Sequence, residues 1–286
     1  MKLFYYQENN FGDKLNPWLW SQLIPEVIDE DQSTAFIGIG TLINDKLPLK
    51  TKNARLRVIF GSGVGYAQGV PQIDKSYKIY CLRGPLSAQA LGVSTKLAVT
   101  DGAILIRKLF NSNSKKLYKF SYIPHYEMAG EGWRLVCERL GFGYIDPRWP
   151  IEKVLSCISQ SQVILAEAMH GAIIADSLRI PWIPVVSNST ILSFKWQDWC
   201  QSIDTEYKPS YVKRLHHPRQ KLDILLPARL TRDWFRQQEA ASQLLNITKT
   251  VHPSLSTDKK VENLTEEMDK ILQKFKEDLA KGAFIK

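Results

Sequence analysis

Residues 163–186 read VILAEAMHGAIIADSLRIPWIPVV, and this stretch contains the alternation that decides the fold. Residues 163–167 and 182–186 are short apolar runs, and each indicates a strand that is buried on both faces. Residues 170–178, between the two runs, have the pattern of a helix. A strand, a helix and a second strand in this order are typical of an α/β fold with a parallel sheet.

The same alternation extends through most of the chain on the N-terminal side of this stretch. A polar stretch, NSNSKK at 111–116, divides it into two series. The predicted strands are residues 2–6, 34–40, 57–63, 77–82, 97–104, 118–124 and a short one at Tyr144, and the predicted helices are residues 12–23, 85–91, 132–140 and 151–159.

Two α/β units in tandem fit this order of elements best. Each unit would have a parallel sheet with helices on both faces, and such sheets bind ligands at the carboxyl ends of their strands. The cleft between the two units is therefore the expected site. We predict an N-terminal domain at 1–116, a C-terminal domain at 117–248, and a linker with a further helix at 249–286.

The last part of the chain has a separate amphipathic pattern over residues 262–280. The ordinary role of such an amphipathic helix is to pack on the rest of its own protein, and the alternative is docking on a membrane or a partner. Residues 249–260 are expected to be a flexible lead-in. The apolar residues at helical spacing are Leu264, Met268, Ile271, Leu272, Phe275 and Leu279.

Composition excludes several classes of protein. The chain has 286 residues, of which 44% are hydrophobic, so it is not a disordered polypeptide. No apolar run approaches the roughly 18 residues that a transmembrane helix needs, and the residues after Met1 lack the core of a signal peptide. We therefore expect a cytoplasmic protein.

The cysteines do not predict a metal site or a disulfide framework. They are widely spaced, with no CxxC pair and no cluster with histidine, whereas zinc requires four converging ligands. No clustered carboxylates suggest magnesium either. We expect reduced thiols, no metal and no resident cofactor. The four residues are Cys81, Cys137, Cys157 and Cys200.

The formal net charge is +9, and basic residues gather at 208–221 and again from Lys249 onward. Neither stretch matches a nucleic-acid-binding motif, so we expect no nucleic-acid partner. A solvated surface explains both stretches, and attraction to an anionic membrane surface is the second interpretation. His216 and His217, in the first stretch, receive no role.

The first candidate site residues follow predicted strands of the N-terminal unit. Asn10 and Asp13 lie where the first strand gives way to a helix, so Asp13 is either a base or a helix N-cap. GSGVG at 61–65 would allow a ligand close to Gly63, or it only forms a turn. It is not GxGxxG, and no GxxxxGK[ST] loop occurs, so nucleotide binding receives no support from motifs.

Arg83 lies at the end of the strand at 77–82, just before a predicted helix. Its planar guanidinium suits bidentate binding of a phosphate or a carboxylate, which makes it a candidate for an anion site. A structural ion pair is the equal alternative, with Asp101 at another strand end as the expected partner.

Two histidines lie at predicted strand ends of the C-terminal unit. His125 follows the strand at 118–124, and His170 begins the helix at 170–178. A single histidine is more often structural, but two in equivalent positions favour anion binding or proton transfer at the cleft.

A series of short motifs, in order and spacing, resembles the polysaccharide pyruvyl transferase family, and the second part is similar to the branch of succinoglycan-type ketal pyruvyl transferases. The resemblance covers residues from about 3 to about 202. The motifs are NFGD at 10–13, FIGIG at 36–40, FGSG at 60–63, LRGPLS at 82–87, TDG at 100–102, IPHY at 123–126, MHGA at 169–172, DSLRIP at 176–181 and FKWQDW at 194–199.

This resemblance implies two Rossmann-like domains in a GT-B-like arrangement, with the active site in the cleft between them. It also implies transfer of a pyruvyl group from phosphoenolpyruvate to two hydroxyls of a sugar, which forms a cyclic ketal and releases phosphate. Relatives have an arginine two residues before the position of His170, where this chain has Ala168. The expected acceptor is a lipid-linked oligosaccharide at the inner face of the plasma membrane, with peripheral contact to that membrane.

On this scheme, Asp13 accepts protons from the sugar hydroxyls and His170 supplies a proton or stabilises the leaving phosphate. Arg83 binds the carboxylate or the phosphate of the donor. His125 and Lys195 assist that binding, and Trp196 and Trp199 are candidates for stacking on sugar rings. Asn10 and Gly63 complete the expected substrate-binding set.

Two alternatives stay open. A nucleotide-sugar glycosyltransferase could use the same architecture, but retaining enzymes of this type often have two acids separated by seven residues, and here Glu167 meets Ala175. The second alternative is a carbohydrate-binding relative that has lost its chemistry, and Ala168 in place of arginine supports it. Binding of UDP would favour the first alternative.

Overall fold

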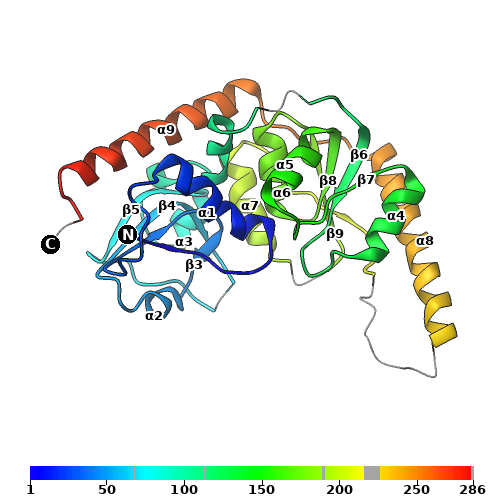
Figure 1. Cartoon of the computed structure of the whole chain (residues 1–286), viewed down its shortest axis with the longest axis horizontal. Helices are drawn as coiled ribbons and strands as arrows, with labels where there is room; N and C mark the ends of the chain where they lie inside the picture. Colours follow the sequence, from blue (N-terminus) through cyan, green and yellow to red (C-terminus); the bar gives the residue numbers. More distant parts are fainter. Residues whose placement is uncertain (67, 112–113, 189–190, 216–225, 285–286) are drawn as a thin grey trace.

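The computed structural model describes residues 1–66, 68–111, 114–188, 191–215 and 226–284. Two parallel β-sheets lie side by side, the first built from the blue and cyan part of the chain and the second from the green part (Figure 1). The prediction of an α/β fold with parallel sheets is therefore confirmed. Among the described residues, no helix has the length and apolar character to cross a membrane.

The first sheet has five parallel strands, with β4 (Leu56–Val64) at its centre. The order is β1-β2-β4-β3, and β5 also pairs with β4. Helix α1 (Phe11–Leu23) follows the first strand, as predicted. The other elements are β1 (Lys2–Phe4), β2 (Thr34–Ile37), β3 (Thr41–Ile43), α2 (Leu47–Lys50), β5 (Tyr77–Leu82) and α3 (Pro85–Ala90).

The predicted strand at 97–104 is wrong. Two short 3-10 helices, η1 (Thr95–Leu97) and η2 (Gly102–Lys108), occupy this region, and only Ala98 forms an isolated bridge to β5. The physical reason is Asp101, whose Oδ1 accepts a hydrogen bond of 3.0 Å from the Ala103 backbone N–H. This local bond turns the chain into a helix although the residues around it are apolar.

The second sheet also has five parallel strands, in the order β10-β9-β8-β6-β7. The strand, helix and strand predicted within residues 163–186 are confirmed as β8 (Ser161–Ala166), α6 (Met169–Ser177) and β9 (Trp182–Val186), within two residues at each end. The other elements are β6 (Tyr118–Ile123), α4 (Glu131–Leu140), β7 (Gly143–Tyr144), α5 (Ile151–Ser159), α7 (Ser193–Ser202), β10 (Ser210–Tyr211) and α8 (Leu226–Thr250).

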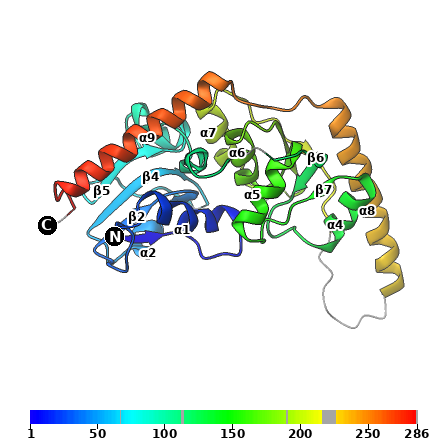
Figure 2. The same cartoon turned by 45° about the horizontal axis from the view of Figure 1, so that its top comes forward.

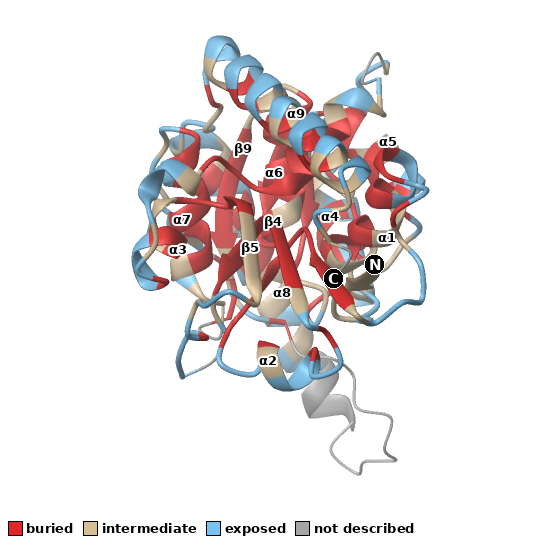
Figure 3. Ribbon diagram, turned by 90° about the vertical axis from the view of Figure 1, so that its left-hand side faces the viewer, coloured by how far each residue is buried: buried red, intermediate tan, exposed pale blue. Residues whose placement is uncertain are grey.

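One hydrophobic cluster is shared by the two sheets, and each half has a further buried cluster of its own. Buried residues from both halves belong to the same cluster, with Phe36 and Phe60 from the first sheet and Ile173 and Trp182 from the second half. Helix α6 contacts both α1 and η2, so it lies between the halves. Figure 3 shows α6 as almost wholly buried. The halves are therefore held together by packing and not only by a linker.

Helix α9 (Asp258–Ala280) returns to the first half of the molecule (Figure 2). It contacts β5 and η2, and Phe275 lies 5.3 Å from the ring of Tyr80 and 5.5 Å from that of Phe36. The residues of its buried face are Val261, Leu264, Met268, Leu272 and Phe275.

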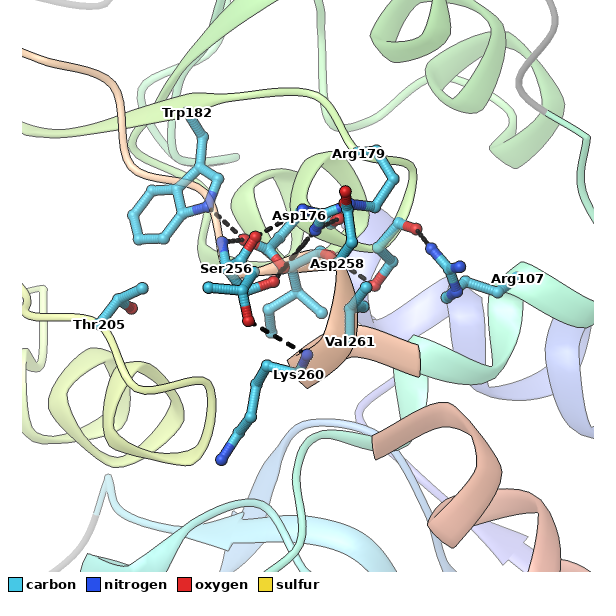
Figure 4. A network of polar contacts seen from close by, with 12 residues as sticks. Arg107, Asp176, Arg179, Trp182, Thr205, Ser256, Asp258, Lys260 and Val261 are labelled. Carbon is cyan, nitrogen blue, oxygen red and sulfur yellow. Dashed lines mark hydrogen bonds and ion pairs between the residues drawn. The ribbon is translucent and has the colours of Figure 1, made fainter. Parts of the chain in front are cut away.

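The segment between α8 and α9 is fixed, which corrects the expectation of a flexible lead-in. Ser254 exchanges two backbone hydrogen bonds with Trp182, of 2.7 and 2.9 Å. The backbone N–H and hydroxyl of Ser256 both donate to the carboxylate of Asp176, and Arg179 donates to Asp258 (Figure 4). These bonds hold the chain where it crosses from the second half to the first.

The predicted division at 1–116, 117–248 and 249–286 stays a prediction. Helix α7 belongs to the second half by sequence but contacts α3 and β4, and α9 packs on the first half. The basic stretch at 208–221 lies partly outside the described residues, and so do His216 and His217.

Candidate active site

A pocket of about 490 Å³ lies between the two halves, at the carboxyl ends of strands from both sheets. Five of the seven predicted site residues line it, namely Asn10, Asp13, His125, His170 and Lys195. Arg83 and Gly63 do not. The other lining residues are Tyr6, Glu8, Phe11, Gly12, Gly40, Thr41, Tyr66, Tyr126, Glu127, Ala168 and Met169.

Asn10 and Asp13 lie together at the start of α1. Asn10 occupies the N-cap position, so the interpretation of Asp13 as the cap is wrong. The amide of Asn10 instead donates a hydrogen bond of 2.9 Å to Oδ2 of Asp13. Burial raises the pKa of Asp13 to about 6, and the bond from Asn10 opposes part of this rise. Asp13 can therefore accept a proton near neutral pH.

His170 lies in the first turn of α6, where it packs against the backbone of α1. A Cβ atom at Gly12 would lie 2.3 Å from Nδ1 of His170, so only glycine allows this approach. Burial lowers the pKa of His170 to about 3, and the positive charges of Lys195 and Arg83 lower it further. The imidazole is consequently neutral when no anion is bound.

His125 is positioned by a buried carboxylate, that of Glu167. One oxygen of Glu167 accepts a hydrogen bond of 2.9 Å from the backbone N–H of His125, and the other accepts two bonds of 2.6 Å from Ser187. Glu167 therefore ties together the ends of β6, β8 and β9. Burial, with the charge of Lys195 second, lowers the pKa of His125 to about 4.

This positioning role of Glu167 was not predicted from the sequence, where Glu167 was considered only as one of the two paired acids of a retaining glycosyltransferase. The available signal was an acidic residue directly after a buried apolar strand, where an unpaired carboxylate would be costly. Tyr6, Glu8, Tyr66, Tyr126 and Glu127 were missed as pocket residues. Tyr6 lies at the end of the strand predicted at 2–6, and the other four lie in loops between the predicted elements, where sequence pattern gives no direction for a side chain.

Lys195 reaches the pocket from α7. It is only 8% exposed, and its ammonium group donates a hydrogen bond to the hydroxyl of Tyr66. Burial lowers the pKa of Lys195 to about 8, and Arg83 lowers it further. Among the described residues that line the pocket, Lys195 is the one lysine or arginine.

Arg83 lies behind the pocket wall and is completely buried. Its Nε donates a hydrogen bond of 2.9 Å to Asp198, and Nη1 donates one of 2.7 Å to the hydroxyl of Thr41. Asp198 also accepts bonds of 2.8 and 2.6 Å from the backbone N–H and hydroxyl of Ser87. The structure therefore corresponds to the alternative of a structural ion pair, but with Asp198 in place of the expected Asp101.

Gly63 makes room for this ion pair and does not line the pocket. A Cβ atom there would lie 2.2 Å from Cζ of Arg83, so a side chain would displace the guanidinium. The glycine at position 63 is therefore explained by packing against Arg83 and not by the close approach of a ligand.

Trp196 and Trp199 are wrong as sugar-stacking residues. They are 0% and 2% exposed, and their rings lie 6.1 and 5.1 Å from that of Trp182 in the core. They lie on the inner face of α7, where large aromatic residues bury the most area.

No metal cluster is evident in the part of the chain that the structure describes, where no group of three His, Cys, Asp or Glu side chains converges. The expectation of a reaction without a metal stays a prediction. The pocket instead collects a lysine, two imidazoles and a carboxylate with a raised pKa. This set can bind an anion and move protons.

Comparison with known proteins identifies the family. The family model described as polysaccharide pyruvyl transferase matches residues 31–190. The chain is also 40% identical over 217 residues to the succinoglycan biosynthesis protein ExoV of Rhizobium meliloti (strain 1021), an alignment that covers 74% of this chain and 68% of ExoV. The resemblance stated from the motifs is confirmed, and the chain belongs to the polysaccharide pyruvyl transferase family.

Proposed function

We propose that this protein transfers the pyruvyl group of phosphoenolpyruvate to two hydroxyls of one sugar in exopolysaccharide biosynthesis, forming a cyclic ketal. The observation that carries the proposal is the convergence of Lys195, His125 and His170 opposite Asp13 in one pocket. Phosphoenolpyruvate has a phosphate and a carboxylate, so its site needs cationic and N–H donors. We further propose that the two halves form a GT-B-like pair of Rossmann-like domains around this pocket.

Lys195 replaces the arginine that relatives carry two residues before the position of His170. Ala168 occupies that position here and lines the pocket. The ammonium of Lys195 enters the same pocket from α7, and a bound anion would raise its lowered pKa by giving the charge a partner. His125 and the amide of Asn10 are the further donors in this proposal.

The proposed reaction then has three steps: addition of the first sugar hydroxyl, loss of phosphate, and addition of the second hydroxyl. His170 donates a proton to the methylene carbon of the enol, while a sugar hydroxyl attacks the neighbouring carbon and gives its proton to Asp13. The bond from that carbon to the phosphate oxygen then breaks. The second hydroxyl attacks the same carbon, and its proton leaves with the phosphate as hydrogen phosphate.

The proposed acceptor is a lipid-linked oligosaccharide, reached at the cytoplasmic face of the membrane through peripheral contact. A net charge of +9 supports attraction to an anionic surface. Tyr6, Tyr66 and Tyr126 line the pocket and offer rings that can stack on a sugar. The proposal includes no nucleic acid and no cofactor other than the donor substrate.

Calorimetric titration with phosphoenolpyruvate tests the donor. Lys195→Met is expected to weaken binding by about 10-fold to 100-fold, the range for a lost bond between charged groups. Binding to the unchanged protein should also weaken as the pH rises through about 8, because the pKa of Lys195 is lowered to about 8 and its ammonium is then lost.

Lys96→Met is the matched control, since Lys96 is exposed on the surface and should leave binding unchanged. UDP and a UDP-sugar are titrated in parallel. Binding of UDP without phosphoenolpyruvate would contradict the proposal in favour of glycosyl transfer. Binding of a carbohydrate alone would contradict it in favour of a relative without chemistry.

A further inference from the structure

Asp101 and His170 form a buried pair at the back of the pocket. Oδ2 of Asp101 and Nε2 of His170 are 3.8 Å apart, and each atom is buried without a hydrogen-bond partner among the residues that the structure describes. Asp101 precedes η2 and His170 lies in the first turn of α6, and these two elements pack against each other. Two buried polar atoms that face each other across this distance need an explanation, because buried polar groups are ordinarily bonded.

The two oxygens of Asp101 have different surroundings. Oδ1 accepts the bond from Ala103 that caps η2. Capping needs only this one oxygen, so it does not explain why a carboxylate with a second, unpartnered oxygen is buried here. An asparagine or a serine would form the same cap without a buried charge.

The imidazole of His170 is oriented with its two nitrogens in different environments. Nδ1 lies beside Gly12, and both residues line the pocket. Nε2 faces the interior and Asp101. In a neutral imidazole one nitrogen carries the proton and the other accepts, and the partner of one nitrogen decides the state of the other.

The charges that act on the pair are those of three groups, Arg83, Asp198 and Lys195. Arg83 and Asp198 act on Asp101, and Asp101 in turn acts on the buried Cys81 of β5. Lys195 and Arg83 act on His170. Burial raises the pKa of Asp101 to about 7, while it lowers that of His170 to about 3. Burial therefore disfavours charge on both groups, and an anionic ligand would favour the imidazolium.

We propose that Asp101 is the positioning residue of His170, and that its Oδ2 keeps a proton on Nε2 so that Nδ1 exchanges the proton with the substrate. When the donor is bound, the imidazolium gives its Nδ1 proton to the methylene carbon and becomes neutral, with Nε2–H directed at Asp101. Nδ1 regains a proton from solvent before the next turnover. The transfer of this proton to the donor rests on the proposed function, whereas the Nε2–H tautomer of His170 does not depend on it.

Asp101→Asn is the decisive variant. Its side-chain oxygen can still cap η2, but its NH₂ group now faces Nε2 and can only donate, which moves the imidazole proton to Nδ1. We expect kcat to fall by about 100-fold to 10,000-fold, the range for loss of a general acid in the right tautomer. The KM for phosphoenolpyruvate should stay within about threefold of its original value.

Nitrogen NMR of the full chain with labelled histidine reads the tautomer without any activity. The expected spectrum has His170 as the Nε2–H form in the unchanged protein and as the Nδ1–H form in Asp101→Asn, with His170→Gln used to assign the signal. An Nδ1–H form in the unchanged protein overturns the proposal, and so does a normal kcat in Asp101→Asn.

Asp101→Ser covers the case in which Asp101→Asn does not fold. Serine retains the cap but places no donor or charge at Nε2, so we expect reduced kcat and a mixture of tautomers. A single Nε2–H form in Asp101→Ser overturns the proposal. A chain that binds no phosphoenolpyruvate but shows the expected tautomers would refute the proposed function and leave the pair intact.

Discussion

Two buried clusters, each with an acidic and a basic side chain, lie near the carboxyl ends of the strands of the first sheet. They differ in how many of their polar atoms have hydrogen-bond partners. In the Arg83–Asp198 cluster, the guanidinium and both carboxylate oxygens have partners, including Thr41 and Ser87. In the Asp101–His170 pair, one carboxylate oxygen and one imidazole nitrogen have no hydrogen-bond partner in the described part of the chain. Complete bonding fixes structure, whereas incomplete bonding at a pocket wall leaves groups that a substrate can engage.

The Arg83–Asp198 cluster contributes to the pocket through α7. This helix carries Lys195, which faces the pocket, and Asp198, which is held by Arg83 at the end of β5. The arginine that sequence pattern suggested for the donor therefore acts indirectly. It fixes the helix that places another cation in the pocket.

Breaking the complete cluster should have the largest effect on stability. Arg83→Met leaves the Asp198 carboxylate in the interior without its ion-pair partner, which costs about 3–5 kcal/mol in comparable buried pairs. Unfolding in urea, followed by circular dichroism, measures this loss. An unchanged urea midpoint would show that the pair adds nothing to the fold.

The double variant Arg83→Met/Asp198→Leu sharpens the same comparison. It removes both charges, so its loss should be smaller than the sum of the two single losses by about 1–3 kcal/mol. Strict additivity would mean that the two side chains do not interact.

The carboxylate of Asp13, in the pocket, should reduce the stability of the native state, whereas the Arg83–Asp198 pair increases it. Burial raises the pKa of Asp13 from 3.8 to about 6, so the native state binds this proton more tightly than the unfolded state. Native stability is therefore lost as the pH rises from about 4 to about 6. Asp13→Asn removes this loss, and we expect about 1–2 kcal/mol more stability at pH 8 together with at least ~100-fold lower turnover.

Urea unfolding of both proteins at pH 4 and at pH 8 checks the sign. The difference should be small at pH 4, where the carboxyl group is protonated in the native state and still about half protonated in the unfolded state. Equal stability at both pH values would contradict the raised pKa, and full turnover would exclude Asp13 as the base.

The elements and the position of the site followed from sequence because both depend on local pattern. Apolar runs predicted strands, and parallel strands bring their carboxyl ends together, which is why Asp13, His125 and His170 were expected in one cleft and line one pocket in the structure. The strand predicted at 97–104 failed because one hydrogen bond of Asp101 outweighed the apolar pattern around it.

Partners that lie far apart in the chain could not be predicted in this way. Arg83 and Asp198 are separated by 115 positions, and only the docking of α7 on the first half brings them together. The inward direction of Trp196 and Trp199 depends on the same docking. A sequence pattern shows which side chains share a helix face, but it does not show what covers that face.

An exposed pair gives the smallest effect and tests whether burial or pairing sets the difference between the clusters. Lys78 on β5 lies 2.9 Å from Asp278 on α9, with the two side chains 36% and 24% exposed. Asp278 keeps a bond of 2.6 Å from Tyr80 when the lysine is removed. Lys78→Ala should therefore cost less than about 1 kcal/mol, and the difference should shrink further in 0.5 M salt (about 4 Å screening). A loss as large as that of Arg83→Met would mean that pairing, and not burial, decides the stability of both.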